Sequence, residues 1–98
     1  MLKIKEKKFG TDHPEVASSL EIVAHRYRSL GNYDEALPLQ KRAVEIKEKE
    51  LGPDHPRLPL ALNALAFHYQ SLGDYGAALP LLQRSLRIRE NALGPFLA

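Results

Sequence analysis

The chain has 98 residues, of which 44% are hydrophobic and 27% charged, and its formal net charge is +2. With 14 basic and 12 acidic residues scattered along it, the charge is too small and too mixed to predict binding to nucleic acid. The apolar runs are far shorter than a membrane span, and the absence of cysteine excludes disulfides and thiolate metal sites. We therefore expect a soluble, cytoplasmic protein with neither a membrane nor nucleic acid as a partner.

The first segment, residues 1–9, is a partial copy of a later one. Residues 10–51 and 52–93 align without a gap and are identical at 19 of 42 positions, and the same shift aligns residues 1–9 with 43–51. Repetition at such a period indicates stacked units, each of which relies on its neighbours to bury its apolar face. We expect residues 1–9 to be the C-terminal part of a second helix from an incomplete repeat.

Residues 10–51 form the first complete repeat and predict two antiparallel helices. Pro14 suits the first helical position, because its ring presets φ and its missing N–H has no intrahelical acceptor. Gly31 suits the helix end, because glycine tolerates the left-handed conformation. The second helix is expected to run from Asp34 to Leu51. Its apolar positions spread over roughly 150° at 100° per residue, which predicts neighbours on two sides.

Residues 52–93 form the second complete repeat and follow the same plan. The first helix is expected to open at Pro56 and to end at Gly73, and the second is closed by Gly94. Residues 94–98 are interpreted as the start of a truncated third repeat. Four alanines recur at matching places, where small side chains let paired helices approach closely: Ala24, Ala66, Ala36 and Ala78.

One pattern of apolar, small and aromatic residues occurs in both repeats. It is Leu62-x-x-Leu65-Ala66-x-x-Tyr69-x-x-x-Gly73-x-Tyr75-x-x-Ala78, with its counterpart over residues 20–36. This pattern resembles the tetratricopeptide repeat. The 42-residue period, the Gly-Pro-Asp-His-Pro turn and the Ala-Leu-Pro-Leu start of the second helix are similar to the longer variety found in kinesin light chains and many bacterial repeat proteins.

The resemblance implies an all-α fold, a right-handed superhelix (α-solenoid) of antiparallel helical hairpins. In this family the first helices line a concave groove that binds peptides or partner proteins. Catalytic activity is not implied. Kinesin-light-chain-like repeats carry paired asparagines in the groove for holding a peptide backbone, and this chain keeps only Asn63 of them.

The histidines do not indicate a metal or catalytic site. His13 and His55 occupy the same place in successive repeats, so we expect them one repeat apart and not converging on one ion. Both are interpreted as structural turn residues. The sequence contains no Ser/His/Asp arrangement, no glycine-rich phosphate loop and no HExxH helix. We expect no enzyme activity, no cofactor and no metal.

The candidate binding residues form one stripe on the first helix of each repeat, which the resemblance places on the concave groove. They are Ser18, Glu21, His25, Arg28, Ser29, Leu60, Asn63, Phe67, Gln70 and Ser71. The first five are polar or charged, whereas Leu60 and Phe67 are apolar. An alternative is that these two apolar side chains pack beneath a neighbouring helix and bind nothing.

Two functions remain open. The first is a scaffold segment that binds a peptide or a partner protein in the groove of the array. The alternative is a self-association module, a homo-oligomer formed through exposed repeat ends by stacking or by helix exchange. Replacement of Gln40 and Glu50 by Leu82 and Ala92 makes the last helix more apolar than its counterpart, which favours association.

Overall fold

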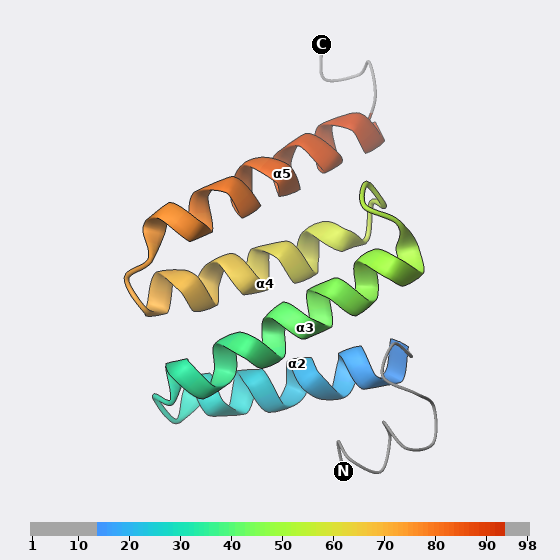
Figure 1. Cartoon of the computed structure of the whole chain (residues 1–98). Helices are drawn as coiled ribbons and strands as arrows, with labels where there is room; N and C mark the ends of the chain where they lie inside the picture. Colours follow the sequence, from blue (N-terminus) through green and yellow to red (C-terminus); the bar gives the residue numbers. More distant parts are fainter. Residues whose placement is uncertain (1–13, 94–98) are drawn as a thin grey trace.

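A computed structural model describes residues 14–93, and its regular structure is entirely helical in this range. The four helices are α2 (Pro14–Ser29), α3 (Tyr33–Leu51), α4 (Leu58–Ser71) and α5 (Tyr75–Leu93) (Figure 1). The predicted all-α fold is thus confirmed, whereas the superhelix stays a prediction. The segments predicted over residues 1–9 and 94–98 lie outside the described residues.

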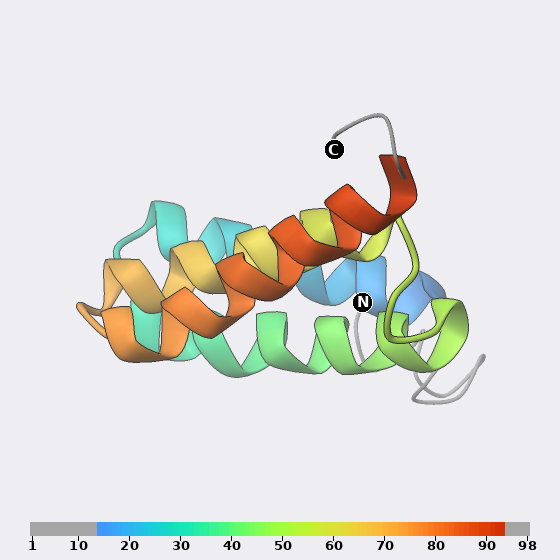
Figure 2. The same cartoon turned by 90° about the horizontal axis from the view of Figure 1, so that it is seen from above.

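The helices form two antiparallel hairpins, α2–α3 and α4–α5, which pack on each other through α3 and α4 (Figure 1). Viewed from above, α2 and α4 lie toward one face of the molecule and α3 lies toward the opposite face (Figure 2). The first helices of the two hairpins therefore share a face, and the candidate binding residues belong to these two helices.

The two hairpin turns end α2 and α4 with the same glycine motif. Gly31 and Gly73 have φ values of +83° and +79°. The N–H of the residue after each glycine donates back to the carbonyl of Tyr27 or Tyr69, at 2.8 and 2.9 Å. These bonds satisfy carbonyls that no helical N–H reaches, and they need a residue that adopts the left-handed conformation without strain. The prediction from the glycines is correct at both turns.

The start of α4 differs from the expectation. The helix was predicted to open at Pro56 but begins at Leu58. His55 closes a turn first, because its Nδ1 accepts a hydrogen bond from the N–H of Arg57 at 3.1 Å and its carbonyl accepts one from Leu58 at 2.9 Å. Pro59, where the first repeat has Ala17, then occupies the first turn of the helix. Its missing N–H leaves no intrahelical hydrogen bond unmade there.

The buried apolar side chains form two clusters, and α3 contributes to both. The N-terminal cluster consists of Val16, Ala17, Leu20, Ala43 and Ile46. The junction cluster joins the two hairpins and consists of Val44, Leu58, Ala61, Leu62, Leu65 and Ile88. Ala43 and Val44 are adjacent in the chain yet belong to different clusters, so α3 is buried on two sides, as its wide apolar stripe predicts.

The four repeated alanines are all buried. Ala24, Ala36 and Ala66 have no exposed surface, and Ala78 is 1% exposed. Because alanine has no side chain beyond Cβ, these positions allow the backbones of paired helices to come close. A larger side chain at any of them has no space to enter.

Candidate protein-binding groove

The ten predicted groove residues all lie on α2 and α4, and none of them is buried. Ser18, His25, Ser29, Leu60 and Phe67 are exposed, and Glu21, Arg28, Asn63, Gln70 and Ser71 are partly exposed. The two apolar members indicate a binding surface most clearly, because Leu60 is 73% exposed and Phe67 is 50% exposed. No helix among residues 14–93 covers them.

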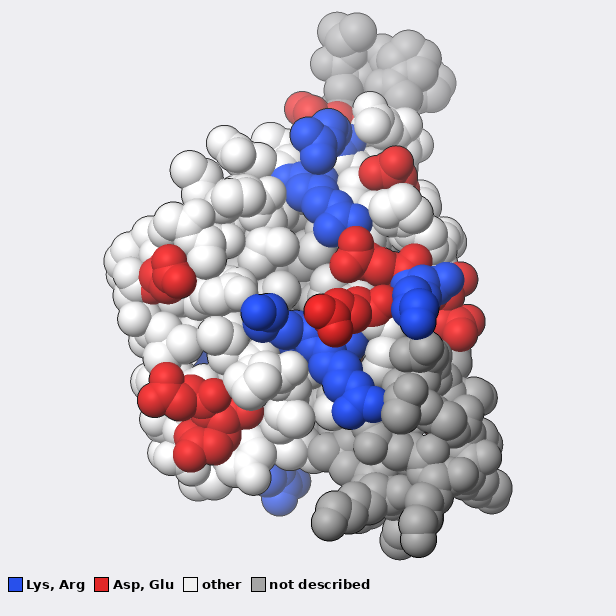
Figure 3. All heavy atoms as spheres, in the orientation of Figure 1, with Lys and Arg blue, Asp and Glu red and all other residues white. Residues whose placement is uncertain are grey.

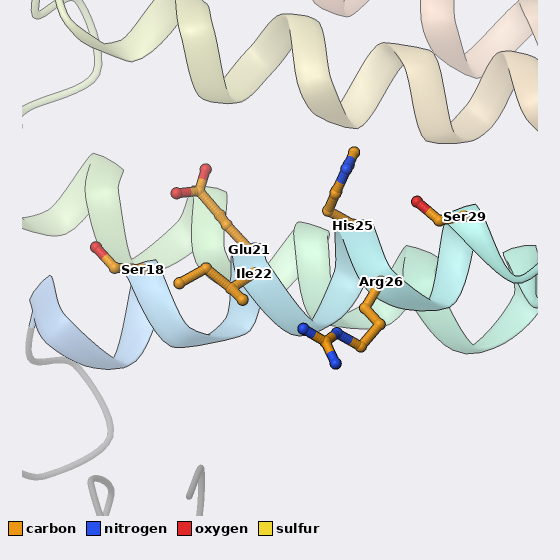
Figure 4. Close-up of a pocket in the computed structure, with 6 residues that line it drawn as sticks. All are labelled: Ser18, Glu21, Ile22, His25, Arg26 and Ser29. Carbon is orange, nitrogen blue, oxygen red and sulfur yellow. The ribbon is translucent and has the colours of Figure 1, made fainter.

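The first part of the groove is a hollow along α2, drawn in Figure 4. Its volume is about 570 Å³, and its lining contains four predicted groove residues together with Ile22 and Arg26, which were not predicted. All six side chains come from one helix, and Ile22 is 64% exposed. This hollow is therefore shallow and open to solvent, and α2 alone lines it.

A second pocket lies where α2, α3 and α4 meet. Ser18 and Leu60 occupy the same position in successive repeats, and the structure brings them together in this pocket of about 430 Å³. The rest of the lining was not predicted, since it comes from the end of α3 and from the turn before α4: Lys47, Glu50, Leu51 and Arg57. An exposed leucine beside such a pocket provides a place for an apolar ligand side chain.

Glu21 is less available to a ligand than the sequence suggests. Its Oε1 lies 2.8 Å from Nζ of Lys47, and its Oε2 accepts a long hydrogen bond from the amide of Gln40 at 3.4 Å. Gln40 is buried and also donates to the carbonyl of Ala61 at 3.5 Å. The carboxylate thus belongs to a polar network that joins α2, α3 and α4.

Arg28 connects the two first helices. Its guanidinium carbon lies 4.3 Å from the centroid of the Phe67 ring, in a cation–π contact between α2 and α4. Its Nη2 lies 3.0 Å from Nδ1 of His25. Because a guanidinium only donates, the imidazole nitrogen is the acceptor in this contact. The structure therefore brings His25, Arg28 and Phe67 into one group.

His68 interacts electrostatically with Arg28 and His25 and was not predicted to belong to the site. It is 4% exposed, and its buried Nδ1 has no hydrogen-bond partner among the residues that the structure describes. Burial lowers the pKa of His68 from its ordinary value of 6.5, and the positive charges of Arg28 and His25 lower it further. The sequence offers no signal for this, because its counterpart in the first repeat is Arg26, which is exposed.

Ser71 and the outer basic residues are held by contacts within the protein. The hydroxyl of Ser71 donates to the carbonyl of Phe67 at 3.0 Å. On the outer helices, Arg84 lies 2.7 Å from the carboxylate of Glu48 and donates to the carbonyl of Pro53 at 2.8 Å. Basic and acidic side chains are interleaved along one ridge of the face in Figure 3.

Residues 14–93 contain no cluster of three or more side chains that could hold a metal ion. Within the same range, no helix is both long and apolar enough to cross a membrane. The arrangement on α2 and α4 offers apolar surface, hydrogen-bonding groups and a guanidinium, which are means of binding.

The tetratricopeptide repeat model matches residues 2–49 and, in a second overlapping match, residues 23–91. The chain belongs to the tetratricopeptide repeat family. Tetratricopeptide repeats form non-catalytic scaffolds that mediate protein–protein interaction, so the partners of this chain are proteins. No curated protein matches the chain.

Proposed function

We propose that the chain is a segment of a protein-interaction scaffold that binds a peptide or a segment of a partner protein along α2 and α4. The observation that carries this proposal is the exposure of Leu60 and Phe67 on the face they share with polar side chains of α2. Aromatic side chains such as Phe67 often contribute much of the binding energy when a ligand covers them. The ligand that fits such a face is amphipathic.

The repeat architecture supports a more specific assignment. We infer a kinesin-light-chain-like array with repeats at residues 10–51 and 52–93, flanked by part of a second helix over residues 1–9 and the start of a third repeat over residues 94–98. The 42-residue period and the His55 turn, which sets the start of α4, support this subtype. A cytoplasmic location is part of the same proposal, and cell fractionation tests it.

The groove is tested with Phe67→Ala, on peptides first selected against the wild-type chain from a display library. Because the ring is half exposed and lies outside both buried clusters, its removal should leave the melting temperature nearly unchanged. Affinity should fall about thirtyfold or more, as truncation of an anchor typically costs 2 kcal/mol. Leu79→Ala is the matched control, because Leu79 is similarly exposed but lies on α5.

Two results would count against the groove. A Phe67→Ala variant that melts as the wild type does and keeps full affinity eliminates the proposed site. A variant that melts earlier assigns Phe67 to packing, as in the alternative that Leu60 and Phe67 lie beneath a neighbouring helix. Ser29→Ala, a change at the edge of the stripe, should cost little in either measurement.

Self-association is a second candidate, and the outer face of α5 favours it. Leu79, Leu82 and Leu86 are exposed there. Their counterparts on α3 include Leu37 and Val44, which pack in the junction cluster under α4. The occupant that fits this face is the first helix of a second copy, because α2 has the same place in its hairpin as α4 and itself exposes Ile22. Such a contact would repeat the α3–α4 interface between copies.

Sedimentation velocity at several concentrations tests this candidate. A second copy stacked on α5, or exchanging helices with it, should raise the mass at tens of micromolar, and Leu86→Glu should return the chain to a monomer. Glu is chosen because it places an unpaired charge in the apolar contact. A wild-type chain that remains monomeric at tens of micromolar contradicts self-association and leaves the groove untouched.

A further inference from the structure

The candidate groove contains a guanidinium, that of Arg28, whose edge faces no acid among residues 14–93. One face of Arg28 is covered by the Phe67 ring, and one of its five N–H donors reaches His25. Among residues 14–93 no carboxylate contacts this guanidinium. A guanidinium stacked on an aromatic ring keeps its in-plane donors free in a fixed orientation. The two contacts therefore prepare Arg28 to receive an anion.

The charges around Arg28 leave this end of the groove positive. Glu21, the acid on the same stripe of α2, already pairs with Lys47 at 2.8 Å. The charged and titratable neighbours of His68 are Arg28 and His25, and both lower its pKa after the larger effect of burial. Among residues 14–93, no group donates to or accepts from the buried Nδ1 of His68.

A pocket with a mixed lining lies at the other end of the same stripe. Its volume is about 430 Å³; Leu60 and Leu51 are its apolar side chains, and Ser18, Lys47, Glu50 and Arg57 line the rest of it. Leu60 precedes Phe67 by seven residues, which is about 10 Å along a helix axis at 1.5 Å per residue. An extended chain rises by about 3.3 Å per residue, so it covers this distance in about three residues.

We propose that the groove binds an extended peptide segment in which an acidic group lies about three residues from an apolar side chain. The acidic group binds the free edge of Arg28, and the apolar side chain enters the pocket at Leu60. This inference rests on the proposed groove function and names its ligand. A carboxylate and a phosphate share the required chemistry, since each accepts two parallel hydrogen bonds from a guanidinium.

The affinity of this site for an anion should also depend on pH. An anion on Arg28 screens the positive charge that disfavours protonation of His68, so binding of the anion and of a proton support each other. Because the pKa of His68 is lowered from 6.5, the affinity for a carboxylate ligand should rise as the pH falls below 6.5 toward about 5.5. Aspartate remains ionised over this range, so the effect reports on the protein and not on the ligand.

The test is an NMR titration of the full chain with ten-residue Gly/Ser peptides that contain Leu-Ser-Ser-Asp or, in reverse order, Asp-Ser-Ser-Leu. Matched peptides carry Asn or phosphoserine in place of Asp. The Asp peptide in its preferred order should bind about tenfold more tightly than its Asn partner at low salt, because charge-assisted hydrogen bonds are stronger than neutral ones. Whether Asp or phosphoserine binds better identifies the source of the anion, and either preference supports the proposal.

Variants connect the preference to its residues. Arg28→Gln should abolish the preference for Asp over Asn, whereas Arg87→Gln, at an exposed position of α5, should retain it. Leu60→Ser should weaken the Asp and Asn peptides equally. Should Arg28→Gln fail to fold, raising the salt concentration on the wild-type chain gives the same answer, because screening should reduce the preference for Asp.

The outcomes separate the ligand from the groove. Peptides that shift the amides of α2 and α4 without a preference for an anion overturn the acidic ligand and leave the groove function standing. Peptides of every kind that leave these amides unshifted overturn both. A preference for Asp that neither salt nor Arg28→Gln reduces assigns the anion to another place and contradicts the proposal.

Discussion

Helices α3 and α5 have the same length and the same Leu-Pro-Leu start, yet they are buried to different extents. α3 buries five residues, whereas α5 buries three. The contrast is sharpest at one repeat position, where Val44 is 4% exposed and Leu86 is 58% exposed. The cause is the neighbour, because α4 lies on α3 and no helix among residues 14–93 lies on the same side of α5. An apolar repeat position is thus buried only where the stack continues.

The first helices show the same dependence. Ala64 and His68 of α4 face the first hairpin and are partly or fully buried, whereas their counterparts Ile22 and Arg26 of α2 are exposed. Identical places in the repeat therefore hold a buried imidazole in one hairpin and an exposed guanidinium in the other. The position of a hairpin in the stack therefore decides whether a side chain at a given repeat position is buried or exposed.

The largest test of this contrast removes side chains from the core and from the open face. Leu62→Ala should destabilise the chain by about 2–5 kcal/mol, because Leu62 is fully buried in the junction cluster and its loss leaves a cavity. Leu86→Ala should change stability by less than about 0.5 kcal/mol in a monomer, since the side chain is already in water. Urea unfolding measures both, and equal losses would contradict the assigned packing.

The second test fills the close contacts within the hairpins. Ala24→Leu and Ala66→Leu should each destabilise by about 1–3 kcal/mol, because a larger side chain at a fully buried alanine forces the paired helices apart. Ala92→Leu, at an exposed position near the end of α5, serves as the control. Unchanged stability in both core variants would show that the helices do not approach closely at these alanines.

A smaller effect is expected for the ion pair that links the hairpins. Glu48 and Arg84 are in contact at 2.7 Å and partly shielded, so a double-mutant cycle with Glu48→Gln and Arg84→Gln should give a coupling of about 0.5–1 kcal/mol. Glu90, the counterpart of Glu48 on α5, is exposed, and Glu90→Gln should have almost no effect. A coupling that does not fall with added salt would exclude an electrostatic origin.

The subtlest test uses pH. The pKa of His68 is lowered in the folded state by burial and by the charges of Arg28 and His25, so the unfolded chain binds a proton below about 6.5 while the folded chain resists it. The stability contributed by neutral His68 is present above the unfolded pKa and is lost as the pH falls below it.

A variant isolates this contribution from the other histidines. The difference in unfolding free energy between the wild-type chain and His68→Gln should shift in favour of the variant as the pH falls from 7.5 to 5.5, because glutamine does not titrate. Urea unfolding at each pH measures it. A difference that stays constant over this range would show that His68 titrates alike in both states.

Most of the helical framework follows from the sequence alone. The 42-residue repeat, Gly31 and Gly73 predict where the helices end, and the recurring alanines predict the close contacts. These features are local, since one residue's φ preference or side-chain size acts within a turn or a helix pair. Even the displaced start of α4, at Leu58, has a local cause in the His55 turn and in Pro59.

The interactions within the candidate groove were decided by the tertiary structure. Glu21 pairs with Lys47, which is 26 residues further along the chain, and Arg28 contacts Phe67, which is 39 residues further. The repeat period predicts neither contact. Such contacts depend on how far long side chains reach once the hairpins have packed. The burial of His68 and the exposure of Leu86 likewise depend on which helix lies alongside, because a repeat specifies the same face in every copy but the stack covers it only where another helix follows.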